Sequence, residues 1–385
     1  MYTVVDLGAG VEPTDIDAHG NVLAHRGPLG TPTLFPVAGA PIDIGAKLGL
    51  SLSSSYGMND LLQVVASGNG GFVCDLAKNT VKAIPLDLPL ALNDVGLAVG
   101  RVGGRPAYSL AGGPPLPIFS DDSGGSALAV NDSGTMVGVG FAGGLANQAA
   151  WSFHLGGMLK VHTVGSPSIA TAINKSGMIA GVDDGAGFVI DANGQLTQIT
   201  VAGLNTSVLD IADGGRFVGL VSNATTRRGF VGQGAAIQDL TALLVASPTV
   251  VIEMGVAINA AGWIAATGRV GGELHGLLLK PIAPGSRFRT LATIVHILIG
   301  GRLDDDGVGI GHGPEPLPPG PLRDGLVGMA LVELAELLED RGTRAGVRAL
   351  ARERMQVALE HVFAGAHTHA KSSELGSGFP PLSEL

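Results

Sequence analysis

The sequence is short of several residue types, and each shortage excludes a class of protein. Its 385 residues include one cysteine, Cys74, so internal disulfides are excluded and no Cys/His spacing suggests a zinc site. Only 15% of the residues are charged, with 23 Lys and Arg against 33 Asp and Glu. Nucleic acids and anionic membranes are bound by clustered Lys and Arg, which the sequence lacks, so we expect neither as a partner. No apolar run approaches the roughly 18 residues that a membrane-spanning helix needs.

Glycine, by contrast, is abundant. The sequence has 61 glycines and 22 prolines, and this glycine content is about twice the usual share. Such a content disfavours a mostly helical protein, and the glycines lack the every-third-residue period of collagen. The composition therefore indicates a turn-rich β protein, and the length allows two or three domains.

A motif of the form Asn-x-x-Gly recurs about every forty residues. The clearest copies are ALNDVGLAVG, AVNDSGTMVG and AINKSGMIAG, and weaker copies bring the number to seven. We call the first residue of each motif the anchor; the seven anchors are Asp17, Asn59, Asn93, Asn131, Asn174, Ala212 and Asn259. Asn and Asp favour tight turns and glycine supplies a positive φ, so each motif predicts a hairpin between two strands. Seven such units fit a β-propeller better than an open stack.

Two further patterns complete the repeat. Beyond each anchor a small or polar residue precedes an aromatic residue or Leu, as in Ala150-Trp151 and Gly187-Phe188, and these rings are expected to fill the space between blades. A fourth alternating strand follows in six repeats and is missing from the last. The N-terminal residues 2–7 have this missing pattern, so the first strand is predicted to complete the last blade and close the ring.

Together, the period, the Ile-Asn-x-x-Gly-x-Val-x-Gly anchor, the small-aromatic strand and the Asp-Leu strand resemble the bacterial HAF repeat family. The resemblance covers residues 1 to about 283 and implies a propeller-like β fold with no well-established biochemical activity. The triplet that names the family is present here only as His275-Gly276-Leu277. Its members are often extracellular, whereas the first residues here have neither the charged nor the apolar segment of a secretory signal, so we expect a cytoplasmic protein.

Beyond residue 283 the apolar residues recur at helical spacing. The pattern predicts three amphipathic helices over residues 284–366 and a flexible, polar tail over residues 367–385. The apolar stripes are expected to pack on one another, on the propeller or on a second copy, which would give a homodimer. The predicted fold is thus mainly β: a seven-bladed β-propeller over residues 1–283, closed by the N-terminal strand, followed by a small C-terminal α-helical region.

One candidate metal site lies in the C-terminal segment. Asp304, Asp305 and Asp306 stand in a glycine-rich stretch near His312 and offer oxygen ligands for Ca²⁺ or another divalent metal. The alternative is a solvated acidic turn, and apart from this segment no cofactor is expected.

A second candidate site consists of the residues that follow the anchors. They include Asp60, Asp94, Asp132, Lys175 and Asp213. If the repeats superpose, these side chains gather on one rim of the propeller, where they could bind a cation or a basic peptide. The alternative is that Asp simply favours this turn.

A third candidate site combines Arg227, Arg228 and His275, which precede the third strands of the sixth and seventh repeats. Facing one funnel, they could bind an acidic group, and His275 is a candidate general base. The alternative is that His275 has a structural role.

Two functions are compatible with these observations. Because no nucleophile elbow, phosphate-binding loop, dinucleotide fingerprint or zinc-protease motif is present, the first hypothesis is a non-catalytic scaffold that recognises a peptide or protein partner through a propeller face. The alternative is a propeller enzyme, a lyase, hydrolase or cyclase of a biosynthetic pathway, with its site in the central funnel and His275 or a divalent metal activating the substrate. Convergence of His, Arg and Asp in one pocket would favour the enzyme.

Overall fold

The computed structural model describes residues 1–119, 123–141, 148–162, 167–245, 249–282 and 348. Apart from residue 348, the predicted helices of residues 284–366, the tail and the candidate metal ligands Asp304, Asp305 and Asp306 lie outside the described residues. The chain divides into two compact units, one of which consists of residues 6–243 and 249–280. In the other, Tyr2 forms a parallel bridge with Leu244. No helix among the described residues has the length and hydropathy needed to cross a membrane.

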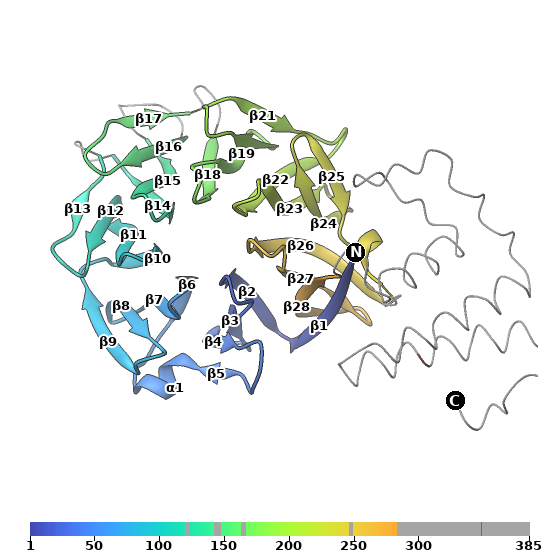
Figure 1. Ribbon diagram of the computed structural model, residues 1–385, viewed down its shortest axis with the longest axis horizontal. Coiled ribbons are helices and arrows are strands. Elements are labelled where there is room, and N and C mark those ends of the chain that lie inside the picture. Colours follow the sequence, from blue (N-terminus) through green and yellow to red (C-terminus); the bar gives the residue numbers. More distant parts are fainter. Residues whose placement is uncertain (120–122, 142–147, 163–166, 246–248, 283–347, 349–385) are drawn as a thin grey trace, which may run out of the picture. The chain divides into compact units, whose positions relative to one another are not determined.

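Seven sheets of four strands each form the larger part of the described structure. Figure 1 shows the strands β2, β6, β10, β14, β18, β22 and β26 innermost, around the centre of a ring. The fold is therefore a mainly β, seven-bladed propeller, as the repeat predicts.

The first six blades each use four consecutive antiparallel strands. Two blades are β2 (Val11–Ile16), β3 (Val22–Arg26), β4 (Thr31–Phe35), β5 (Ile42–Asp43), and β6 (Ser54–Met58), β7 (Gln63–Gly68), β8 (Gly70–Asp75), β9 (Thr80–Ile84). Two more are β10 (Leu88–Leu92), β11 (Leu97–Val102), β12 (Arg105–Leu110), β13 (Leu116–Pro117), and β14 (Gly125–Val130), β15 (Thr135–Gly140), β16 (Ala149–His154), β17 (Leu159–Val161). The next two are β18 (Ser168–Ile173), β19 (Ile179–Asp183), β20 (Ala186–Ile190), β21 (Leu196–Ile199), and β22 (Asn205–Ile211), β23 (Arg216–Ser222), β24 (Arg227–Gln233), β25 (Ala236–Asp239). The short helices α1 (Ile44–Leu48) and η2 (Thr241–Leu243) follow β5 and β25.

The anchor motif forms the hairpin between the first and second strands of each blade. At Asn93, the side-chain Oδ1 accepts the Leu97 N–H at 2.8 Å and the backbone carbonyl accepts the Gly96 N–H at 3.2 Å. Gly96 has a φ of 83°, which glycine adopts without strain. Leu62 stands at the glycine position of its repeat and keeps the same left-handed conformation, with a φ of 58°. The turn geometry is thus retained even where the glycine is absent.

Aromatic side chains fill the space between neighbouring blades, as the sequence predicts. Trp151 of β16 is fully buried and packs with Leu97 of β11 and Met136 of β15. Phe188 of β20 is also fully buried and packs with Val137 of the preceding blade. The core therefore consists of clusters that join adjacent blades.

The last sheet has the strand order β1-β28-β27-β26, formed by β26 (Val250–Ile258), β27 (Ile264–Val270), β28 (Glu273–Pro281) and β1 (Tyr2–Ala9). The carboxylate of Asp6 in β1 lies 2.9 Å from Nδ1 of His275 in β28. That this strand holds the ring closed stays a prediction, which a truncation tests.

Deleting residues 1–8 should lower the melting temperature far more than deleting residues 371–385, because the first truncation exposes the edge of β28. Both truncated proteins are compared with the full chain by differential scanning calorimetry. Equal melting temperatures for the two truncations would refute ring closure by the N-terminal strand.

Candidate functional site

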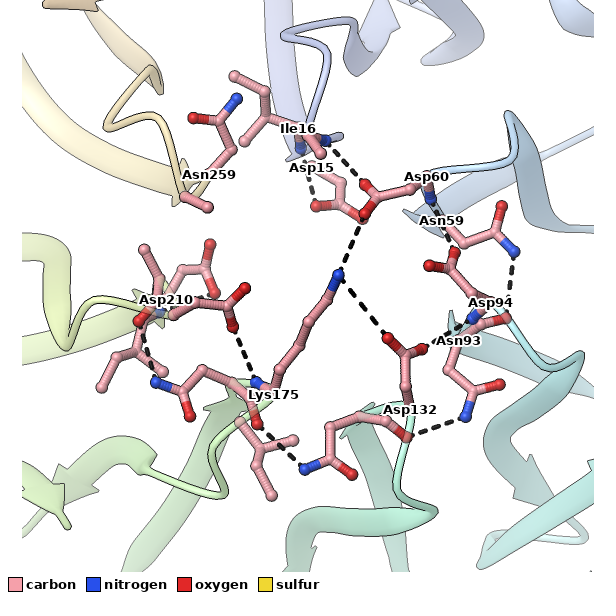
Figure 2. Close-up of a pocket in the computed structure, with 18 of the residues that line it drawn as sticks. Asp15, Ile16, Asn59, Asp60, Asn93, Asp94, Asp132, Lys175, Asp210 and Asn259 are labelled. Carbon is pink, nitrogen blue, oxygen red and sulfur yellow. Dashed lines mark hydrogen bonds and ion pairs between the residues drawn. The ribbon is translucent and has the colours of Figure 1, made fainter. Parts of the chain in front are cut away.

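Six of the seven anchors, all but Asp17, line a cavity at the central channel, and Figure 2 shows Asn59, Asn93 and Asn259 among them. Five anchors are Asn, and each of their amide groups donates to the backbone carbonyl of the following anchor. These hydrogen bonds are Asn59 to Asn93 (3.1 Å), Asn93 to Asn131 (2.9 Å), Asn131 to Asn174 (3.0 Å), Asn174 to Ala212 (2.9 Å) and Asn259 to Asp17 (2.9 Å). Five of the seven blade junctions are thus held by a buried amide.

The other two junctions follow Asp17 and Ala212, which have no amide to donate. In both blades an aspartate two residues before the anchor supplies the link instead. Asp15 accepts the N–H of Met58 at 2.8 Å, and Asp210 accepts the N–H of Ile258 at 2.7 Å. Every blade junction around the channel therefore carries at least one side-chain hydrogen bond, from an anchor amide or to Asp15 or Asp210; we call these seven bonds the channel seam.

The two seam aspartates are unusual acids. Burial raises the pKa of Asp15 to about 8, the N–H of Met58 lowers it, and the nearby Asp210 raises it further. Burial likewise raises the pKa of Asp210, against the opposing effect of the N–H groups of Ile258 and Ile211. At neutral pH, Asp15 therefore mostly carries its proton.

The residues that follow the anchors form a second ring at the mouth of the same channel. We call the carboxylates of Asp60, Asp94, Asp132 and Asp213 the acid ring. Each accepts a backbone N–H from the same position of the preceding blade, at 2.8 Å from Ala18, 3.0 Å from Asp60, 3.0 Å from Asp94 and 2.9 Å from Lys175. The structure thus brings the predicted residues Asp94, Asp132 and Asp213 together, while their binding of a ligand stays a prediction.

Lys175 occupies the same position as the acids but in the fifth blade. Its Nζ lies 3.4 Å from Oδ2 of Asp60 and 3.8 Å from Oδ2 of Asp132, so the side chain extends across the channel (Figure 2). Burial lowers its pKa, but the carboxylates of Asp60 and Asp132 outweigh this effect and raise it overall. Lys175 is therefore held as an ammonium ion.

These groups line one cavity of about 220 Å³ that receives residues from all seven blades. It contains the two seam aspartates, the acid ring and Lys175, together with apolar side chains such as Met58 and Ile173. Among the residues that the structure describes, no three His, Cys, Asp or Glu side chains are placed to hold a metal ion.

The third candidate group does not reach this cavity. Arg227 donates to the sulfur of Met254 at 3.4 Å, and Arg228 pairs with Asp239 at 3.5 Å. His275 contacts Asp6, and none of the three predicted residues lines the cavity. The channel cavity therefore lacks the convergence of His, Arg and Asp that would favour an enzyme.

Asp15 and Asp210 were not among the residues predicted from the sequence. A signal for them exists, because each stands two residues before one of the two anchors that are not Asn. This signal can be recognised only when it is known that the amide of an Asn anchor links neighbouring blades. Cys74 is a fully buried core residue, and burial raises the pKa of its thiol to about 11.

Neither a protein-family model nor a curated protein matches the chain, so the HAF repeat resemblance stays a prediction. Solved structures are similar in fold. Selenomethionine-substituted virginiamycin B lyase from Staphylococcus aureus has a TM-score of 0.50 and 12% identity, over 73% of this chain and 100% of that one. A catalytically inactive variant of this lyase with quinupristin has a TM-score of 0.48 and 11% identity over the same shares. A putative gluconolactonase has a TM-score of 0.36 and 13% identity, over 72% of this chain and 92% of that one. At these identities the likeness concerns the fold alone.

The channel seam yields a test of stability. Asn131→Asp keeps the oxygen that accepts the Thr135 N–H but removes the amide that donates to Asn174, and it puts a negative charge beside that buried carbonyl. We expect the free energy of unfolding to fall by about 2 to 4 kcal/mol. The matched control is Asn223→Asp, in an exposed turn where the side-chain oxygen accepts the N–H groups of Thr225 and Thr226. Urea unfolding measures both, and equal stabilities would contradict the role of the amide.

The raised pKa of Asp15 yields a test of pH dependence. The folded protein keeps a proton on Asp15 up to a pH of about 8, whereas the unfolded chain loses it near its ordinary value of 3.8. Since the folded state binds more protons between these values, this group lowers the stability as the pH rises from 4 to 8. Asp15→Asn should flatten the dependence of the melting temperature on pH in this range, while the exposed Asp184→Asn control should retain it. A steeper fall for Asp15→Asn would contradict the assignment.

Proposed function

We propose that the protein is an enzyme whose site is the central channel, where an amine-bearing small molecule binds and Asp15 acts as a proton donor. The observation that carries this proposal is the presence of two kinds of carboxyl group in one cavity. Asp15 is mostly protonated at neutral pH, whereas Asp60 and Asp132 are paired with the ammonium of Lys175. A buried carboxyl group whose pKa is raised toward neutral, as that of Asp15 is, is characteristic of sites of acid–base catalysis.

The charge of the cavity supports a cationic ligand. The acid ring contributes four carboxylates at the channel mouth, and Lys175 is the one basic residue among the described lining residues. An excess of negative charge in a concave site concentrates cations. The volume of about 220 Å³ matches a small metabolite or a single side chain better than a drug-sized ligand.

The lining residues also limit the reaction class. The described lining contains no Ser, Thr, Cys, His or Tyr, so the familiar side-chain nucleophiles for acyl transfer are absent from it. A protonated Asp15 can instead donate its proton to a carbonyl oxygen or a leaving group. Elimination, lactone opening and cyclisation all use such a step, in agreement with the lyase, hydrolase or cyclase alternative. The similar lyase structures support only the fold. The support for the proposed enzyme comes from the residues that line the cavity.

A peptide-binding scaffold is the second candidate, and one observation favours it. Leu61 and Val95 directly follow two acid-ring residues, and their side chains are 54% and 61% exposed. Apolar residues beside carboxylates suit a peptide with a basic residue next to apolar ones. Such a partner would use the anchor face of the propeller and need not undergo any reaction.

Binding is tested with cadaverine, a diamine, and with the neutral 1,5-pentanediol by isothermal titration calorimetry. We expect cadaverine to bind and the diol not to bind. The double variant Asp60→Asn and Asp132→Asn should weaken cadaverine binding at least about tenfold, because it removes two charged partners, whereas Asp184→Asn should not. Equal binding of the diol, or no effect of the double variant, would refute the cation site.

Catalysis is tested by screening amine-bearing esters and lactones for turnover at pH 7. Asp15→Asn should lower any turnover about 100-fold or more, the usual contribution of a general acid, with cadaverine binding retained. Turnover that survives Asp15→Asn unchanged would exclude Asp15 as the proton donor. Binding of a basic peptide without turnover of any compound would favour the scaffold.

A further inference from the structure

Lys175 departs from the pattern of its ring in a way that concerns ligand binding. Four of the seven repeats have Asp after the anchor, and only the fifth has a basic residue there. The backbone of Lys175 keeps the common geometry, since its N–H donates to Asp213 like the N–H groups of its counterparts. The presence of Lys in place of Asp in the fifth repeat therefore changes the side chain but keeps the backbone geometry of the ring.

The Lys175 side chain places its ammonium group between carboxylates of two other blades. It extends from the fifth blade toward Asp60 in the second and Asp132 in the fourth (Figure 2). The cavity thus already contains a primary amine of this chain in contact with two carboxylates. A ligand with the same group would meet the same partners.

These contacts are loose. The distances of 3.4 and 3.8 Å exceed the 2.7 to 2.9 Å of a strong charge-assisted hydrogen bond. The Lys175 side chain is 56% exposed, and the carboxylates of Asp60 and Asp132 are 29% and 36% exposed. Ion pairs with this exposure are screened by solvent and contribute little to stability. Lys175 can therefore leave its position at small cost.

We propose that Lys175 is a displaceable strap across the channel, and that the ligand carries a primary ammonium group which takes the place of the Lys175 ammonium between Asp60 and Asp132. This inference rests on the proposed function and specifies its ligand class. Since neighbouring carboxylates hold Lys175 in its protonated form, it lacks the free amine that a covalent role would need. Its part is to compete with weakly bound cations and so to set the selectivity of the site.

The strap is tested with Lys175→Met, which keeps an unbranched side chain and removes the charge. Loss of the competitor should strengthen cadaverine binding about two- to fivefold, whereas 1,5-pentanediol should remain without binding. Lys160→Met, at an exposed position of β17 outside the cavity, is the matched control and should leave the affinity unchanged. Tighter binding of CaCl₂ without tighter binding of cadaverine would overturn the proposal.

A second measurement separates displacement from a general effect of charge. Trinitrobenzenesulfonate modifies lysines in the wild-type protein, and mass spectrometry follows each site with and without saturating cadaverine; the reagent is kept in large excess because it also reacts with cadaverine. Displacement from the carboxylates should expose Lys175 and raise its rate of modification relative to that of Lys160 severalfold. An unchanged or lower rate at Lys175 would overturn the strap.

The outcomes distinguish the two proposals. If cadaverine binds the wild type in an Asp60-dependent manner but Lys175→Met binds it no more tightly, the strap is wrong and the cation site stands. If cadaverine binds neither protein, the proposed function and the strap are both wrong.

Discussion

The channel seam is the interaction on which the rest of this structure depends. A blade of four short strands cannot bury both of its faces alone, so the ring requires each blade to dock on the next. Around the channel, every junction has a seam hydrogen bond, from an Asn amide in five cases and to an Asp carboxyl in two. A single such bond adds only about 1 kcal/mol, but leaving its buried partner unpaired costs more. The seam therefore acts mainly by making incorrect docking unfavourable.

The same turns that form the seam also create the candidate site. The anchor faces the next blade, and the residue after it reaches the channel mouth, where its carboxylate accepts a backbone N–H from the preceding blade. Within one short motif, the anchor stabilises the ring and the residue after it places a carboxylate at the channel mouth. Fold and site cannot be altered independently at these positions, because the acid ring also takes part in the junctions.

Much of this architecture follows from the sequence, and the remainder depends on which side chains meet. The forty-residue period and the turn preferences of Asn and Gly give the blades and the anchor hairpins, and superposing the repeats brings Asp94 and Asp132 to one rim. Superposition does not show that Asp15 replaces a missing amide, because that role appears only when two blades are docked. Arg227, Arg228 and His275 do not line the channel cavity, because proximity to a strand end does not specify which side chains face the axis; that they bind a ligand stays a prediction.

The departures from the motif tune the charge of the channel. A strict Asn-Asp-x-Gly repeat would place seven carboxylates at the rim, where like charges raise one another's pKa. Even with four acids, burial and then the charges of Asp132 and Asp60 raise the pKa of Asp94. Ala18, Lys175 and Ala260 stand at the other three positions. Asp15 of the channel seam is mostly neutral. The channel therefore keeps an excess of carboxyl groups, while these replacements limit the repulsion between them.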